Sequence, residues 1–176
     1  MDAFELFLNT GGAGARGSGG IPPRPTLVRH VAPQLIYGRW ASVQAFAPLL
    51  DGAPISVLHA LRIECKRLRY TLEFFRELLG PEAEDVIVEV VTLQDHLGNL
   101  NDADVAISAI SGFLFPLHRG TTASSEDRII APGVVSYLAA KQRELQEAVA
   151  EFPVTWTNFC RAEVREWLAS AVAAIE

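Results

Sequence analysis

Residues 58–75 read LHALRIECKRLRYTLEFF, a run without proline or glycine. Pro54 precedes this run, and Gly80-Pro81 follows it. The spacing predicts one helix over about residues 54–79, with Ser56 as its N-cap and Gly80 at its C-terminal cap. At about 100° per residue, one arc of this helix carries a histidine and four cations: His59, Arg62, Lys66, Arg69 and Arg76. These residues are named the basic strip.

Apolar side chains border the basic strip on both sides. The broad apolar face holds Leu61, Leu68, Leu72, Phe75 and Leu79, and a second apolar cluster holds Ile63, Tyr70 and Phe74. Arg62 and Lys66 have no acidic residue at helical spacing, so their like charges repel by a few tenths of a kcal/mol. Uncompensated cations of both types suit the oxygens of a phosphate partner. The alternative is a salt-bridged face that pairs with carboxylates of neighbouring helices.

The same residues resemble the signature of a known family, the CHAD domain. The resemblance rests on His59-x-x-Arg62-x-x-x-Lys66-Arg67-x-Arg69-Tyr70, on Glu73-x-Phe75, and on residues 93–102, LQDHLGNLND. It covers roughly residues 26–176 and is closest over residues 58–106. CHAD domains are helical domains that bind inorganic polyphosphate, so the resemblance implies that activity here.

The resemblance makes polyphosphate-binding candidates of His59, Arg62, Lys66, Arg67, Arg69 and Arg39. Arg39 lies on the preceding predicted helix, which in the family carries basic residues toward the site; otherwise it is a surface arginine. We also expect Asp102 or Asp104 to hold a basic side chain of the strip in position. Asp95 and Asp102 could instead suggest metal carboxylates, but no Glu-x-x-His pair accompanies them, and we expect no metal or cofactor.

The whole chain predicts an all-α antiparallel bundle of four long helices plus a C-terminal helix. A flexible Gly/Pro-rich segment (residues 1–25) precedes a CHAD-like bundle (residues 26–176). Helices are expected near residues 26–50, 54–79, 82–115, 133–151 and 154–175, with Thr26 as the first N-cap, a mobile polar loop over 118–132, and a break at Phe152-Pro153. Gly98 is unfavourable inside a helix, which close helix packing could offset.

Composition excludes several classes of protein. The 176 residues are 49% hydrophobic and 20% charged, as in an ordinary single domain. The net charge of −6 argues against a general nucleic-acid binder. Cys65 and Cys160 form no metal-ligand or disulfide pattern, and we expect Cys65 to be a buried free thiol. Because we find neither a signal peptide nor an apolar run of about 18 residues, we expect a cytoplasmic protein.

Three functions remain open at this stage. The favoured one is a non-catalytic binding module for polyphosphate or a similar linear polyanion. The alternatives are a phosphohydrolase that uses His59 as acid–base or nucleophile, which lacks a Glu-x-Glu-x-Lys motif, and a helical protein that docks an acidic partner. The resembled family usually has two bundles that face each other across a groove, and this chain carries one copy of the motif, resembling the second bundle. It is therefore a half-length form, or a homodimer supplies the other half.

Overall fold

The computed structural model describes residues 27–119 and 132–175 of the chain, and over these ranges it contains α-helices and two short 3-10 helices but no strand. The α-helices are α2 (Val28–Gln44), α3 (Ile55–Phe75), α4 (Ala83–Arg119), α5 (Pro132–Phe159) and α6 (Ala162–Ala173); the 3-10 helices are η1 (Ala47–Leu49) and η2 (Arg76–Leu78). The predicted all-α bundle is confirmed. None of the described helices combines the length and the apolar character needed to cross a bilayer.

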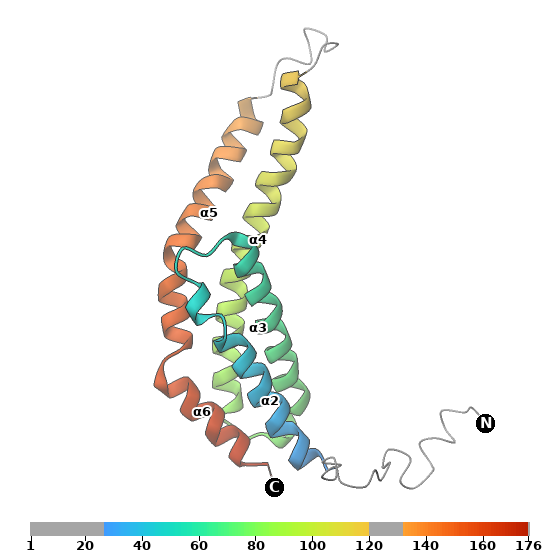
Figure 1. Cartoon of the computed structure of the whole chain (residues 1–176), viewed down its shortest axis with the longest axis vertical. Coiled ribbons are helices and arrows are strands. Elements are labelled where there is room, and N and C mark those ends of the chain that lie inside the picture. Colours follow the sequence, from blue (N-terminus) through green and yellow to red (C-terminus); the bar gives the residue numbers. More distant parts are fainter. Residues whose placement is uncertain (1–26, 120–131, 176) are drawn as a thin grey trace, which may run out of the picture.

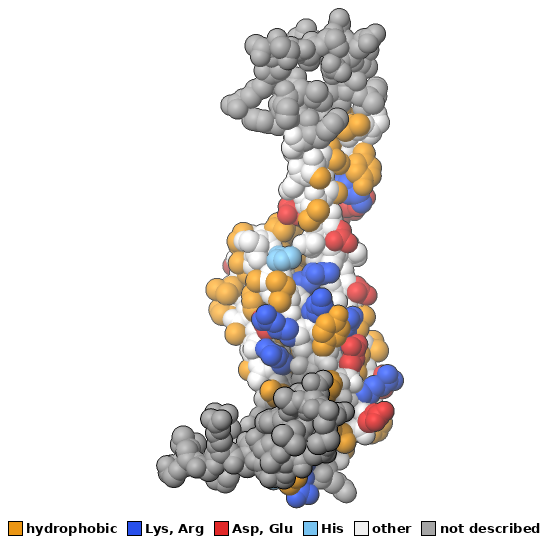
Figure 2. All heavy atoms as spheres, turned by 90° about the vertical axis from the view of Figure 1, so that its right-hand side faces the viewer, with side chains coloured by type: hydrophobic (Ala, Val, Ile, Leu, Met, Phe, Trp, Pro, Cys, Tyr) orange, Lys and Arg blue, Asp and Glu red, His pale blue; other side chains and the backbone are white. Residues whose placement is uncertain are grey.

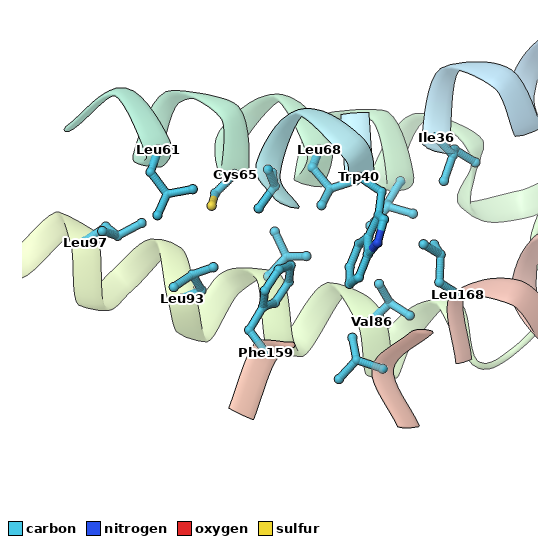
Figure 3. Packing of buried hydrophobic residues seen from close by; sticks show 14 of the residues in the cluster. Ile36, Trp40, Leu61, Cys65, Leu68, Val86, Leu93, Leu97, Phe159 and Leu168 are labelled. Atoms are coloured by element: carbon cyan, nitrogen blue, oxygen red, sulfur yellow. The ribbon is translucent and has the colours of Figure 1, made fainter. Parts of the chain in front are cut away.

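The helices pack around one core at the lower half of the molecule in Figure 1, where α2 and α3 lie beside α4 and α6 closes the end. Figure 3 shows the packing of Ile36, Trp40, Leu61, Cys65, Leu68, Val86, Leu93, Leu97, Phe159 and Leu168. Cys65 is a buried free thiol, as predicted.

The buried core ends where α4 and α5 continue past the other helices as a projecting pair (Figure 1). No described side chain of α4 beyond Ala103 is buried, and none of α5 before Phe152 is buried. Val105, Val135 and Tyr137 of this pair are all more than half exposed. Two helices alone cannot enclose their apolar side chains, so the stable part of the fold is the bundle around α3.

The basic helix keeps the predicted apolar face but has different ends. Leu58, Leu61, Cys65, Leu68, Leu72 and Phe75 are the buried residues of α3. Pro54 is the N-cap, no side chain caps the helix, and η2 replaces the predicted last turn. Gly80 does not act as a left-handed cap, because its φ is not positive. Instead its N–H donates to the carbonyl of Ala171 at 2.9 Å, so it brings the chain against α6.

The predicted helix break at Phe152-Pro153 is wrong, because α5 runs through Pro153 to Phe159. The φ that the proline ring imposes is helical, although the proline removes one backbone hydrogen bond and its ring crowds the carbonyl of the residue four positions earlier. Phe152, Trp156 and Phe159 stack in succession on the core side, which holds the helix together across the proline. Nε2 of His96 also lies 2.8 Å from the carbonyl oxygen of Ala148, beside this point.

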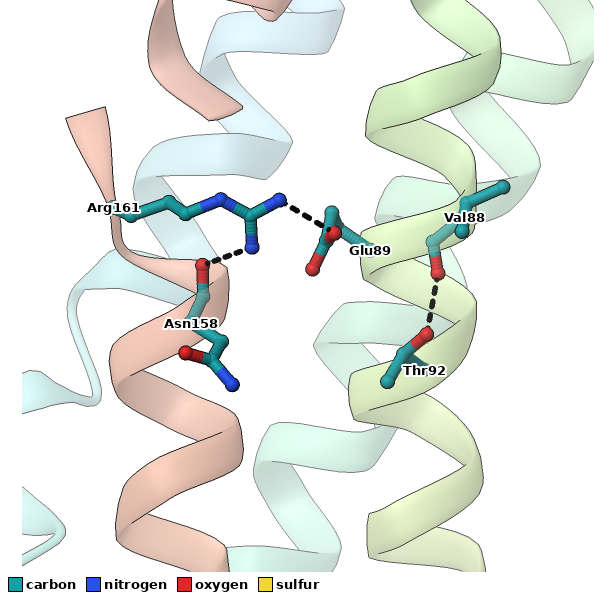
Figure 4. A network of polar contacts seen from close by, with 5 residues as sticks. All are labelled: Val88, Glu89, Thr92, Asn158 and Arg161. Atoms are coloured by element: carbon teal, nitrogen blue, oxygen red, sulfur yellow. Dashed lines mark hydrogen bonds and ion pairs between the residues drawn. The ribbon is translucent and has the colours of Figure 1, made fainter. Parts of the chain in front are cut away.

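The end of α5 is tied to α4 by Arg161 (Figure 4). One terminal nitrogen of Arg161 lies 2.8 Å from a carboxylate oxygen of Glu89, and the other donates to the carbonyl of Asn158 at 2.9 Å. The chain turns into α6 between Phe159 and Ala162. The helix break that was predicted at Phe152-Pro153 lies here instead. Residues 1–25, the predicted Thr26 cap and most of the predicted 118–132 loop lie outside the described residues.

Candidate functional site

The basic strip lies along the border between α3 and α4, which run antiparallel. Nδ1 of His59 is 2.8 Å from Oδ1 of Asn101. Nε of Arg62 is 3.7 Å from the position that a Cβ would take on Gly98. At the far end, Arg76 forms an ion pair with Glu84. As the residue number rises along α3 and η2, the number of the facing residue on α4 falls by the same amount.

This register brings polar and small residues of α4 to the basic strip. It places Gln94 at the level of Lys66, between the Arg62–Gly98 contact and the Arg76–Glu84 pair. Gln94, Gly98 and Asn101 share one stripe of α4, since they are spaced four and three residues apart. The strip is therefore faced by uncharged residues of α4 over its first two turns, and the carboxylate of α4 that pairs with it among the described residues is Glu84, at Arg76.

Two arginines of the strip hold buried donors that the described residues do not satisfy. The Nε atoms of Arg62 and Arg69 are buried without a hydrogen-bond partner, and so is Oε1 of Gln94. Oε1 of Glu73 lies 3.4 Å from Nε of Arg69, but it makes an ion pair rather than a hydrogen bond there. A buried polar atom without a partner costs about 1–3 kcal/mol. The bundle therefore holds this part of α3 at a cost to its own stability.

The cations of α3 divide into paired and unpaired ones. Arg67 forms an ion pair with Glu64, and Arg76 forms one with Glu84. Neither Arg62 nor Lys66 forms an ion pair with any described carboxylate. Among the described cations of the strip and Arg67, the salt-bridged alternative, which requires a carboxylate of a neighbouring helix, therefore holds for Arg76 alone. Arg67 and Arg69 pair with Glu64 and Glu73 of their own helix, and Arg62 and Lys66 form no ion pair.

The second apolar cluster forms the outer border of the strip. Ile63, Tyr70 and Phe74 are 38%, 49% and 80% exposed. The ring of Tyr70 is flanked by two cations, with Nζ of Lys66 5.5 Å and Cζ of Arg69 5.0 Å from its centroid. Figure 2 views the side on which α3 lies in Figure 1, and it shows blue side chains gathered below a pale-blue histidine with orange ones beside them.

The family model of the CHAD domain matches residues 2–111, which is more than half of the chain. The chain belongs to the CHAD domain family. The matched range takes in α2, α3 and most of α4, and with them every residue of the basic strip. No curated protein and no solved structure matches the chain.

Within this CHAD domain, the acidic residues predicted to support the strip lie elsewhere. Asp102 faces α5, where it lines a polar pocket with Asn99, Lys141, Glu144, Glu147 and Glu151. Neither Asp102 nor Asp104 forms an ion pair with a described cation of α3. The supporting contact to His59 comes instead from Asn101, the residue before Asp102. The antiparallel register could have indicated this, because Asn101 shares a stripe with Gln94 and Gly98.

Lys141 and its neighbours form a separate charged group on α5. Nζ of Lys141 donates to Glu144 at 2.6 Å, and this hydrogen bond raises the pKa of the lysine. Glu144 therefore balances the charge of Lys141. Over the described residues, no three His, Cys, Asp or Glu side chains come together closely enough to hold a metal ion.

Two of the six predicted binding residues stand apart from the others, one on another face of α3 and one on another helix. Arg67 lies about 80° around α3 from His59, on the side away from Arg62, and is paired with Glu64. Arg39 lies half-buried on α2 and makes no hydrogen bond or ion pair with a described residue. His59, Arg62, Lys66 and Arg69 remain as one continuous site.

Proposed function

We propose that this CHAD domain is a non-catalytic binding module for inorganic polyphosphate or a similar linear phosphate polyanion. The observation that carries the proposal is the pair Arg62 and Lys66, which stand at the centre of the strip without an ion pair to any described carboxylate. An anion with several charges would satisfy both cations and remove their mutual repulsion.

The linear layout of the strip favours a chain over a compact anion. His59 and Arg69 are ten residues apart, which is about 15 Å along a helix that rises about 1.5 Å per residue. A compact ion such as orthophosphate calls for donors that converge on one point, whereas this strip offers cations at successive levels. The cations lie at the surface of the bundle, so an extended chain can lie along them (Figure 2).

The ring of Tyr70 helps to position two cations of the strip. Lys66 and Arg69 both make cation–π contacts with it. These contacts limit the freedom of two long side chains before a ligand arrives, so less conformational entropy is lost when it binds.

The test is affinity against phosphate chain length. We expect binding to strengthen from orthophosphate through ATP to chains of tens of phosphates, and to weaken steeply as salt rises, because each contact releases counterions. Equal affinity for ATP and for a long chain would overturn the proposal. Release of orthophosphate from the bound chain, which is absent in a mere binding module, would favour the phosphohydrolase instead.

The proposal includes a second copy of the chain as the other wall of the site. A single strip leaves one side of a bound chain in water, and the exposed cluster of Ile63, Tyr70 and Phe74 lies beside it. A two-fold axis would bring two such clusters together and set two basic strips opposite each other. Repulsion between the strips makes this homodimer weak until a polyanion lies between them.

A further inference from the structure

The pair formed by His59 and Asn101 determines which nitrogen of the imidazole carries a proton. Nδ1 of His59 is 2.8 Å from Oδ1 of Asn101, and Nδ2 of Asn101 donates to Oδ1 of Asp102 at 3.3 Å. An ionised carboxylate only accepts hydrogen bonds, so the amide nitrogen belongs on the side of Asp102. The amide oxygen therefore faces His59, and Nδ1 of His59 must donate to it.

This arrangement limits what neutral His59 can do. A neutral imidazole has one N–H, and here it is used at Nδ1, which leaves Nε2 as an acceptor. The oxygens along a polyphosphate chain are acceptors as well, so two acceptors would meet. Only the doubly protonated ring, the imidazolium, can donate from Nε2 to a phosphate oxygen while keeping the bond to Asn101.

We propose that His59 joins the phosphate site only as imidazolium, that polyphosphate binding therefore takes up a proton, and that Asn101 is the positioning residue that imposes this. The inference rests on the proposed function and adds a pH dependence to it. Imidazole groups change charge between about pH 5 and pH 8, so binding would be stronger in mildly acidic than in mildly alkaline solution.

The charged groups near His59 lie on α3, α4 and α5. On α3, Arg62 and Lys66 oppose a further positive charge, as does the N-terminal end of the helix dipole. On α4, Asp102 acts on His59 through Asn101.

The remaining charged neighbours lie on α5, where Lys141 and Glu144 form a pair behind Asp102. A bound phosphate chain brings negative charge to Nε2, and this favours the doubly protonated ring in the complex.

Calorimetry of polyphosphate binding measures the proton directly. We would titrate the full chain with a long polyphosphate at several values between pH 6 and pH 8.5, each in two buffers of different ionisation enthalpy. The variant His59→Gln donates a hydrogen bond without titrating, so the ligand's own end groups contribute equally to it and to the wild type. The expected difference approaches one proton per site at alkaline pH, with a loss of affinity of up to tenfold per pH unit.

Asn101→Leu separates a positioning role from a structural one. Without the amide oxygen, the neutral ring can carry its proton on Nε2 and donate to phosphate, so proton uptake should fall while binding at pH 8 is kept. A purely structural role would weaken binding at every pH and leave proton uptake unchanged. Asn99→Leu is the matched control, because Asn99 is exposed on the same helix and lines the pocket toward α5; it should behave as wild type.

The outcomes distinguish this inference from the function on which it rests. If wild type and His59→Gln take up equal numbers of protons when they bind polyphosphate, the inference is overturned and the proposed function stands. Failure of the wild type and of every variant to bind polyphosphate would overturn the function. Ring ¹⁵N chemical shifts of the free protein at pH 8 give an independent reading: a proton on Nδ1 supports the inference, and a proton on Nε2 refutes it.

Discussion

Arg62 lies against Gly98, with its Nε 3.7 Å from the position that a Cβ would occupy on the glycine. That separation is an ordinary van der Waals contact, and no other atom outside the glycine's own stretch of helix comes within 4 Å of that position. The expectation that Gly98 permits close helix packing is therefore wrong. Because Gly98 has no side chain, the surface of α4 is open at this point, and the side chain of Arg62 lies on it.

Gly98→Ala should stabilise the protein, because alanine is favoured over glycine inside a helix by up to about 1 kcal/mol. The matched control is Gly112→Ala, in the same helix, where a Cβ would meet nothing within 4 Å. Urea denaturation should give both variants similar gains in the free energy of unfolding. A loss of stability confined to Gly98→Ala would show that the contact with Arg62 is tighter than the structure indicates.

Replacing both Arg62 and Lys66 by alanine should abolish polyphosphate binding while leaving the fold intact or slightly more stable. The double variant removes a like-charge pair and one buried donor without a partner. Binding and thermal unfolding would be measured in parallel with Arg143→Ala/Arg165→Ala, which removes two exposed cations from α5 and α6. If the double variant of Arg62 and Lys66 is unfolded, these two residues have a structural role. If the two double variants weaken binding equally, only the net charge of the protein matters.

Gly80→Ala should destabilise the fold, because its new Cβ would lie 3.2 Å from Cβ of Ala174 and 3.4 Å from Cα of Ala171. Cβ of Ala174 can move only with its backbone, so the end of α6 must give by a few tenths of an ångström, at a cost of about 1–3 kcal/mol. Gly38→Ala is the control, since a Cβ on this glycine of α2 meets nothing within 4 Å. Equal melting temperatures for the two variants would contradict the packing of Gly80 on α6.

The helices and the strip could be predicted because both follow from local spacing. The three- and four-residue steps of apolar residues in α3 and α4 lead directly to the buried faces. The ends of helices were less predictable, because they depend on partners distant in sequence. Gly80, followed by a proline, has the sequence of a helix C-terminal cap, but its N–H donates to the carbonyl of Ala171 in α6. Proline usually ends a helix, but Pro153 lies between aromatic residues that pack in the core.

The supporting residues of the site depend on how two helices align. Charge alone indicated Asp102 and Asp104, since an acid near a base suggests an ion pair. The antiparallel register instead turns Asp102 toward α5 and brings Asn101 to His59. Arg67 was included through its place in the family motif, and the helical period directs it to another face, where Glu64 pairs with it.

Cys65 should make the protein lose stability at alkaline pH. Burial raises the pKa of its thiol from 9.0 to about 12. Since the folded state holds the thiol proton more tightly, this contribution is complete below pH 9 and is lost as pH rises from 9 toward 12. By pH 11 wild type should lose roughly 2–3 kcal/mol more than Cys65→Ala does. Urea denaturation at pH 8 to 11 measures this, and parallel curves for the two proteins would contradict it.

Dimerisation should be weak in the free protein and strengthened by polyphosphate. The strips of two copies repel each other, so the exposed cluster of Ile63, Tyr70 and Phe74 must supply the attraction until an anion lies between them. By linkage, a ligand that binds the dimer better than the monomer drives association by the same factor. Phe74→Ser removes the most exposed apolar residue of the cluster, and should weaken ligand-induced association while leaving every cation in place.

Sedimentation with and without polyphosphate measures this association, at chain lengths too short to connect separate monomers. Val88→Ser is the control, because Val88 is exposed on α4 outside the cluster. We expect a monomer without ligand, a dimer with it, and a smaller dimer fraction for Phe74→Ser than for Val88→Ser. A protein that binds one phosphate chain tightly and still sediments as a monomer would show that a single strip is sufficient, because nothing would then require the second wall.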